Sequence, residues 1–308
     1  MTRQELEEDV SVGDTVKITT KSGEFTGRVE EFGESAIRLT NPENGKPKRI
    51  AYEFIMEYDT DVAPAADVIS IGIDTESKMV AIPGKNYRMG QTPVTQRLYK
   101  KLMGENPSWF QRSNDELDEV QRDALEGNTA NNPVERVSWF DAVCFCNRLS
   151  IVEGLTPAYS VDGETVPDYW GYMPHQGESI ESEVECDFDA NGYRLPTNDE
   201  WEEAAKGGED YTYSGSDDLD EVGWYDDNSN NVTHPVAQKM TNGYGLYDMS
   251  GNVWEWVWES GPDYPDFRFP RGGSYCDGSV FCEVSSRFSD CADDQYYCIG
   301  FRLLRPLD

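Results

Sequence analysis

The first sixty residues alternate between apolar and polar positions. Val16 and Ile18 form one alternating run, and Ile37 and Leu39 form another. Dipeptides typical of turns separate the runs: Ser22-Gly23, Phe32-Gly33 and Asn44-Gly45. A period of two residues is typical of strands with one buried face. Residues 1–60 are therefore predicted to form a small domain, a curled barrel of five short strands.

A second domain is predicted after a short linker. Residues 61–70 include Pro64 and few large apolar side chains, which is typical of a linker. Alternation returns in residues 79–90 around the Pro83-Gly84 turn, which predicts a β-hairpin. This hairpin lies near the start of the second domain, residues 71–308.

Helical spacing follows the hairpin. Pro93 suits the first turn of a helix that ends at Gly104, and the predicted apolar face comprises Val94, Leu98 and Leu102. Residues four apart lie on one face of a helix, so this face is predicted to pack against the core.

Capping residues predict two more helices. One begins at Ser138, with Asp141 as its partner in an imperfect capping box, and buries Trp139, Val143, Cys146 and Leu149. The other begins at the capping box of Thr197 and Glu200 and carries Trp201, Ala204 and Ala205.

Three tryptophans alternate with other residues further along the chain. Trp254, Trp256 and Trp258 have the period of a strand with one aromatic face, and we expect them to belong to the scaffold. Arg194 and Glu255 are candidates for a buried ion pair.

Residues 271–302 follow neither period. Gly272, Gly273 and Ser274 open this segment, and residues 299–302 close it. Between these ends Tyr, Cys, Phe, Asp, Ser, Val and Gly follow one another with no period of 2.0 or 3.6 residues. A segment with patterned ends but no internal period is typical of an exposed surface loop rather than of a buried strand or helix.

The composition is that of a globular but strongly acidic protein. Of its 308 residues, 37% are hydrophobic and 12% aromatic, and the formal net charge is −33. The charge argues against a nucleic-acid partner, because phosphates would be repelled over most of the surface. Acidic residues scattered through every segment, with few lysines, favour a protein adapted to the salty cytoplasm of a halophilic archaeon or its virus. An ordinary acidic protein is the alternative.

Targeting signals are not evident in the sequence. No apolar run approaches the length of a membrane span, and the first residues lack the apolar core of a signal peptide. We therefore expect a cytoplasmic location and no membrane partner.

Cysteines are concentrated in the aperiodic segment. The chain has seven, of which four lie within residues 271–302: Cys276, Cys282, Cys291 and Cys298. The histidines are His175 and His234, and no Cys/His spacing suits zinc, so a structural zinc site is not expected.

Five ordered motifs resemble the formylglycine-generating enzyme (sulfatase-modifying factor) family. They are TPVTQRLYKKLMGENPSWF (92–110), NPVERVSWFDAVCFCNRLS (132–150), YRLPTNDEWEEAAKGG (193–208), NGYGLYDMSGNVWEWVWE (242–259), and RGGS with the terminal IGFRLLRP. The resemblance covers about residues 78–306 and implies an α+β, C-type-lectin-like domain of the sulfatase-modifying-factor type. It also implies a structural calcium ion held by main-chain oxygens and one glutamate, which correspond here to Ser250, Gly251, Val253 and Glu255.

The enzymes of this family are copper-dependent oxidases with two active-site cysteines after the GGS motif. Cys282 occupies the later position, but Asp277 occupies the earlier one, and the neighbouring Cys276 is displaced by one residue. Two thiolates need a fixed geometry to bind one soft metal ion. An oxidase is therefore the alternative that we do not favour, and no catalytic residue or catalytic cofactor is expected.

Residues 275–298 also resemble the variable region of the variable proteins made by diversity-generating retroelements. In such proteins AAC codons become NNC, which encodes Tyr, Cys, Phe, Asp, Ser, Val and Gly but not Glu or Gln. Nearly all residues of the segment belong to that set, which would explain its many cysteines. Glu283 and Gln295 cannot come from NNC and are taken as scaffold, and Arg287 is grouped with them.

This resemblance implies recognition rather than turnover, with a protein as the ligand. Stiff aromatic side chains would supply contact area, and aspartates would supply polar specificity. The predicted ligand-binding residues are Tyr275, Cys276, Asp277, Ser279, Val280, Phe281, Cys282, Ser285, Phe288, Asp290, Cys291, Asp293, Tyr296, Tyr297 and Cys298. An inactive relative whose loop has drifted is the remaining alternative.

The N-terminal domain is similar to Sm-like and SH3-like small barrels. Some Sm-like domains bind RNA, but only Lys46, Lys48 and Arg49 form a basic cluster here. A docking or oligomerisation role is therefore favoured over RNA binding.

Overall fold

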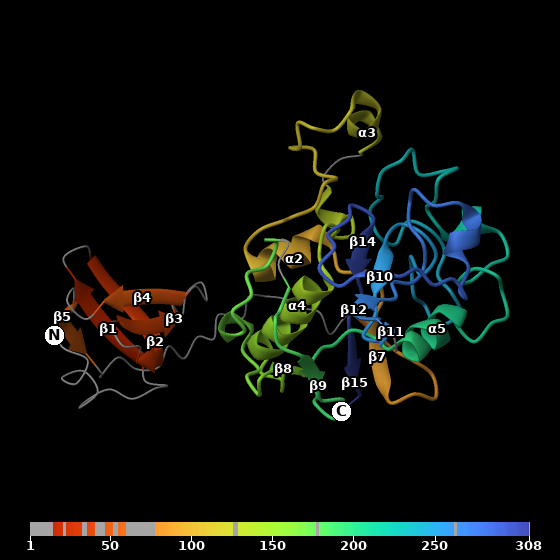
Figure 1. The fold of residues 1–308 in the computed structure, drawn as a ribbon. Helices are drawn as coiled ribbons and strands as arrows, with labels where there is room; N and C mark the ends of the chain where they lie inside the picture. The colour runs from red at the N-terminus through yellow and green to blue at the C-terminus, as the bar shows by residue number, and fades with distance from the viewer. Residues whose placement is uncertain are drawn as a thin grey trace. The chain divides into compact units, whose positions relative to one another are not determined.

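The computed structural model describes residues 78–125, 129–176, 179–261 and 264–307, together with the backbone of five N-terminal strands (Figure 1). The chain divides into two compact units, Met1–Gly72 and Ile73–Asp308. The predicted linker, residues 61–70, lies outside the described residues.

The N-terminal unit contains one antiparallel sheet with the strand order β4-β3-β2-β1-β5. Its strands are β1 (Thr15–Thr20), β2 (Gly23–Phe32), β3 (Ala36–Thr40), β4 (Pro47–Ala51) and β5 (Ile55–Asp59). The register shifts between Thr19 and Thr20 and again between Val29 and Glu31. Irregularities of this kind bend strands, and closure of the sheet into a barrel stays a prediction.

The second unit has short strands and helices joined by long loops, an α+β arrangement (Figure 1). The predicted hairpin is confirmed: β6 (Met79–Ala81) pairs with β7 (Tyr87–Gly90), and β15 (Leu304–Pro306) joins the other edge of β7. The last strand of the chain therefore closes onto the first hairpin of the unit.

Three more small sheets complete the strands of this unit. β10 (Trp254–Trp256) pairs in parallel with β14 (Ile299–Phe301), and the two lie side by side in Figure 1. β12 (Tyr264–Arg268) lies between β11 (Ser260–Gly261) and β13 (Asp290–Cys291). β8 (Tyr159–Val161) pairs with β9 (Val184–Cys186).

The first predicted helix begins later than expected. Thr95, not Pro93, precedes the helix, and its hydroxyl accepts the N–H of Leu98, so α2 is Gln96–Met103. The helix ends at Gly104 (φ 90°), as predicted. Of the predicted apolar face, Val94 is buried in the core but precedes the helix, and Leu98 and Leu102 are half-buried and pack against the core. The buried residues within the helix are Gln96 and Tyr99.

Both predicted capping boxes are present. Ser138 and Asp141 cap α4 (Trp139–Val152), and Thr197 and Glu200 cap α5 (Asn198–Lys206). The predicted apolar residues of both helices are buried.

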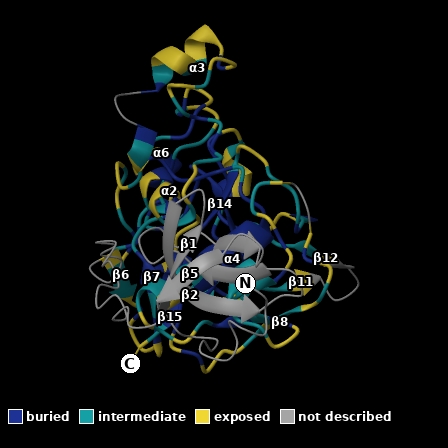
Figure 2. Cartoon of the chain, turned by 90° about the vertical axis from the view of Figure 1, so that its left-hand side faces the viewer, coloured by how far each residue is buried: buried dark blue, intermediate teal, exposed yellow. Residues whose placement is uncertain are grey.

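Nearly every residue of α4 is buried, whereas the short α3 (Glu119–Ala124) lies away from the core and is largely exposed (Figure 2). A further short helix, α6, is Leu219–Val222.

Buried indoles join α4 to β10. Trp139 Nε1 donates to the carbonyl oxygen of Val257 at 2.9 Å, and Trp256 Nε1 donates to that of Val137, also at 2.9 Å. Both side chains are fully buried and yet satisfied. The tryptophans thus act as scaffold and fix the strand on which the aperiodic segment depends.

No helix among the described residues has the length and apolar character needed to cross a membrane.

Candidate ligand-binding surface

The two ends of the aperiodic segment are attached to opposite sides of β10. The N–H of Glu255 donates to the carbonyl oxygen of Arg271 at 2.9 Å, and the N–H of Trp254 donates to that of Cys298 at 2.8 Å. Successive N–H groups of a strand point to opposite sides, so β10 lies between the two ends. The segment therefore leaves and returns to one buried strand.

The charged residues at these ends are buried and paired. Arg271 donates to Glu202 at 3.0 Å and to the carbonyl oxygen of Val284 at 2.8 Å. Arg302 is fully buried and forms an ion pair with Glu255. Arg194 pairs with Glu200 at 2.6 Å, so the predicted pairing of Arg194 with Glu255 is wrong.

Gly273 allows the segment to turn tightly at its start. Its φ of 74° favours glycine, and a Cβ there would lie 2.6 Å from Cys282 Sγ. The short 3₁₀ helix Ser279–Cys282 thereby packs directly against the RGGS motif.

Most of the predicted ligand-binding residues are accessible. Eight side chains are exposed: Cys276, Ser279, Val280, Phe281, Ser285, Phe288, Tyr296 and Tyr297. Four more are half-buried: Asp277, Cys291, Asp293 and Cys298. Phe281, Phe288, Tyr296 and Tyr297 are 46–51% exposed, which is unusual for large aromatic side chains.

Three predicted contact residues are instead buried: Tyr275, Cys282 and Asp290. Tyr275 is 1% exposed, and its ring packs edge-to-face on Phe110 with the centroids 5.0 Å apart. Cys282 packs against α6. Burial and the neighbouring Asp294 raise the pKa of Asp290 to about 7. We therefore correct the prediction for these three residues, which support the segment from inside.

Two residues of the segment that were assigned to the scaffold, Gln295 and Arg287, contact side chains outside it. Gln295 Nε2 donates to the buried Asp141 at 3.1 Å. Arg287, which could come from such a codon, forms an ion pair with Glu202 at 3.4 Å. Gln295 thus contacts the scaffold, whereas the Arg287 side chain is itself exposed and its assignment stays a prediction.

Residues far away in the sequence extend the surface. The Trp109 ring lies 6.4 Å from that of Tyr297, and the Arg136 guanidinium lies 5.7 Å from the Trp109 ring centroid. Ser179 Oγ donates to Asp293 at 3.3 Å. No local pattern in the sequence indicates these neighbours, because loops bring them together.

The residues present do not fit the two-thiolate copper site of the family's oxidases. Asp277, at the earlier cysteine position, accepts hydrogen bonds from Trp254 Nε1 at 2.8 Å and from the Ser274 hydroxyl. The thiol of Cys282 is fully buried, and burial raises its pKa. A neutral thiol and a hydrogen-bonded carboxylate are poor ligands for a soft metal ion.

The one side chain among the predicted calcium ligands, Glu255, does not fit a calcium site either. Glu255 Oε1 accepts from Arg302 Nη2 at 2.7 Å, and Oε2 accepts from Trp201 Nε1 at 2.7 Å. The Ser250 hydroxyl donates to the carbonyl oxygen of Cys282. A carboxylate already paired with a buried cation offers little to a second one, so Glu255 does not fit the calcium role that was expected of it. The main-chain oxygens of Ser250, Gly251 and Val253 as calcium ligands stay a prediction. Among the described residues, no group of three or more His, Cys, Asp or Glu side chains is arranged to hold a metal ion.

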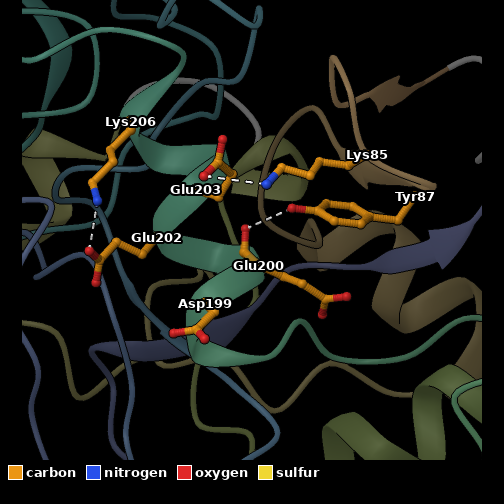
Figure 3. Close-up of a pocket in the computed structure, with 7 residues that line it drawn as sticks. All are labelled: Lys85, Tyr87, Asp199, Glu200, Glu202, Glu203 and Lys206. Atoms are coloured by element: carbon orange, nitrogen blue, oxygen red, sulfur yellow. Dashed lines mark hydrogen bonds and ion pairs between the residues drawn. The ribbon is translucent and has the colours of Figure 1, made fainter.

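A pocket of about 460 Å³ lies beside α5 (Figure 3). Its walls are polar and already paired: Lys206 binds Glu202 at 2.9 Å, and Lys85 binds Glu203 at 3.5 Å. The Tyr87 hydroxyl donates to the carbonyl oxygen of Glu200. Burial and the nearby glutamates raise the pKa of Tyr87, which does not suit it to act as a base.

Comparisons with known proteins agree with this architecture. The sulfatase-modifying factor enzyme 1-like domain matches residues 58–307. The chaperone protein LppX of Paenibacillus barcinonensis is 38% identical over 225 residues, which are 65% of this chain and 73% of LppX. The formylglycine-generating enzyme of Streptomyces coelicolor is 33% identical over 150 residues, which are 38% of this chain and 48% of the enzyme. The chain thus spans about half the length of that enzyme.

Solved structures share the fold over most of the chain. Treponema denticola variable protein 1 superposes with a TM-score of 0.62 and 29% identity, covering 94% of this chain and 98% of that one. CarF superposes with a TM-score of 0.57 and 30% identity, covering 72% of this chain and 87% of CarF. The match over residues 58–307 shows that the chain belongs to the sulfatase-modifying factor enzyme 1-like domain family.

Proposed function

We propose that this protein binds a protein ligand through residues 275–298, and that this segment is diversified as in the variable proteins of diversity-generating retroelements. One observation carries the proposal. Four large aromatic side chains are about half exposed on a segment whose two ends are fixed to one buried strand: Phe281, Phe288, Tyr296 and Tyr297. Exposed aromatic side chains on a rigid frame are typical of recognition surfaces.

The division between scaffold and surface supports this proposal. Eight of the fifteen predicted contact residues, all of types that NNC encodes, are exposed, whereas Gln295, which NNC cannot encode, binds Asp141 of α4. The likeness to Treponema denticola variable protein 1 extends over nearly the whole chain. A chaperone, as LppX is named, also handles protein ligands, so that relative favours the same class of partner.

An oxidase is the second candidate, because the family includes formylglycine-generating enzymes. Against it stand Asp277 at the earlier cysteine position and the burial of Cys282.

The strongly negative net charge makes nucleic acid an unsuitable partner. For the N-terminal sheet we propose a role in docking or self-association. We also propose that the protein works in a salt-rich cytoplasm.

Sequencing the DNA downstream of the gene tests the proposal. We expect a reverse transcriptase gene and a near-repeat of codons 275–298 that differs from the gene only where the repeat carries adenine. The buried positions 275 and 282 provide an internal comparison, because selection for folding should restrict them. Absence of both the repeat and the reverse transcriptase would count against diversification and favour a drifted, inactive relative.

A further inference from the structure

An arginine and a tryptophan from outside the aperiodic segment lie beside one of its exposed tyrosines. The Arg136 guanidinium lies 5.7 Å from the Trp109 ring centroid, and the centroids of the Trp109 and Tyr297 rings lie 6.4 Å apart. Arg136 and Trp109 are half-buried, whereas Tyr297 is exposed. We call these three side chains the Arg136 patch, which combines one cation with two aromatic rings.

Hydrogen bonds hold the Arg136 patch in place. The N–H of Arg136 donates to the carbonyl oxygen of Tyr296 at 3.0 Å, which joins Arg136 directly to the aperiodic segment. The buried carboxyl group of Glu135 accepts the N–H of Trp109 at 2.8 Å, which joins Trp109 to the residue next to Arg136. Arg136 has a φ of 58°, and a residue with a side chain keeps such a φ only where its surroundings require it. The patch is therefore part of the rigid frame.

The charge of Arg136 is not matched by a neighbouring carboxylate. Within the part of the chain that the structure describes, the ion pairs involve other cations. Glu135, the adjacent acid, uses its oxygens to accept the N–H groups of Trp109 and Phe110. Burial raises the pKa of Glu135 to about 8, so this group is largely uncharged at neutral pH. The guanidinium is thus available to an anion from outside.

A carboxylate is the anion that fits the patch. Its two oxygens can accept two parallel N–H groups of a guanidinium. Aromatic rings beside such a pair contact the aliphatic part of an acidic side chain and exclude water from the contact. With a net charge of −33 the protein repels an extended acidic run, but a single ion pair in close contact is much less sensitive to distant charges in salt.

We propose that the Arg136 patch binds one aspartate or glutamate side chain of the protein ligand, and that Arg136 selects for this side chain. The inference rests on the proposed function, because it names the chemistry of the ligand that residues 275–298 would bind. Trp109 and Arg136 lie outside these residues, so they would be common to every variant of a diversified segment. The ligands of different variants would then share an acidic residue.

Selection from a phage-displayed library of random peptides, fused to the coat protein at their C-termini, tests the patch. We expect peptides that bind the wild type to carry Asp or Glu at one position more often than the unselected library. These peptides should bind Arg136→Gln about 10–100-fold more weakly, the loss of a charged hydrogen-bonded pair. Arg136→Asn should show the same loss, and asparagine tolerates the φ of this position. Selection on Arg136→Glu should favour Lys or Arg instead.

Arg97→Gln is the matched control, because it removes an equal charge from an exposed position on α2. Its affinity for the selected peptides should equal that of the wild type. Circular dichroism should show that all the variants remain folded. Equal losses in Arg97→Gln and Arg136→Gln would reveal a general effect of charge and overturn the patch.

Phe288→Ala and Tyr296→Ala separate this inference from the proposed function. Peptides that lose affinity in either variant but show no acidic preference and bind Arg136→Gln normally would overturn the patch and leave the proposed function intact. If no selected peptide loses affinity in Phe288→Ala, Tyr296→Ala or Arg136→Gln, both the patch and the proposed function are overturned.

Discussion

Arg302 and Glu255, which lie 47 positions apart, form a fully buried ion pair with Arg302 Nη2 2.7 Å from Glu255 Oε1. The guanidinium also donates to the carbonyl oxygens of Gly90 and Tyr247, each at 2.8 Å. One side chain therefore joins the first hairpin, a central loop, β10 and the end of the aperiodic segment. The pair is the central polar contact of the scaffold.

Glu255→Gln should lower the free energy of unfolding by about 3–5 kcal/mol, because it leaves the Arg302 charge buried and unpaired. Denaturant unfolding of the wild type and the variant measures this change. Glu203→Gln is the matched control: its partner Lys85 is partly exposed, so the cost should stay below about 1 kcal/mol. Equal costs for the two variants would contradict the scaffold role of Glu255.

Stability should depend on pH through Glu135. Its carboxylate is fully buried and accepts the N–H groups of Trp109 at 2.8 Å and Phe110 at 3.0 Å, and burial raises its pKa to about 8. The folded protein therefore keeps the Glu135 proton at pH values where the unfolded chain has already lost it. Above the ordinary glutamate pKa and up to about 8, this group should lower the free energy of unfolding by about 1 kcal/mol per pH unit.

Glu135→Gln isolates this contribution, because other titrating groups cancel in the comparison. The difference in free energy of unfolding between wild type and variant, measured by denaturant titration at several pH values, should fall as the pH rises. A difference that does not change with pH would show that Glu135 titrates at the same pH in both states.

Tyr275 and Phe288 should respond differently to truncation. Tyr275→Ala removes a buried ring from the Phe110 cluster and should cost about 3–5 kcal/mol of unfolding free energy. Phe288→Ala removes a half-exposed ring and should cost clearly less. Thermal unfolding of the two variants measures both losses. A clearly larger loss for Tyr275→Ala would show that the segment has internal supports, and similar losses would refute this division.

Copper chemistry should not involve Cys282. Titration with Cu(I) should give the same affinity for the wild type and for Cys282→Ser, because the thiol is buried and Asp277 stands at the partner position. An affinity that drops by orders of magnitude in the variant would favour the oxidase.

Salt should stabilise the fold. With a net charge of −33, repulsion among surface carboxylates grows as screening weakens, and the Debye length exceeds about 3 Å below about 1 M salt. Circular dichroism should show loss of folded signal as salt is removed. A fold that persists in dilute buffer would show that the charge is not an adaptation to high salt.

Local sequence signals predicted the elements but not their partners. Ser138 and Thr197 marked the starts of α4 and α5, because a capping box is formed within four residues. The start of α2 was misplaced, because the backbone of Val94 is bound to Phe301 and Val134 and the helix begins only after Thr95.

Which residues of the aperiodic segment are buried was harder to predict than where the segment lies in the sequence. The aperiodic run indicated a surface, and most of its residues are accessible. Nothing within the run distinguished Tyr275 from Tyr296, because the burial of Tyr275 depends on Phe110, which belongs to a distant loop. The same separation in sequence concealed the partner of Glu255.

If residues 275–298 are diversified as proposed, burial of Tyr275 and Cys282 limits how many of the resulting sequences can fold. An NNC codon at either position supplies Asp or Gly as readily as a side chain that fills the core, and such a molecule carries a cavity or a buried charge. The usable repertoire is then smaller than the number of codon combinations. Under that proposal, folding stability would exclude some variants before any ligand is bound.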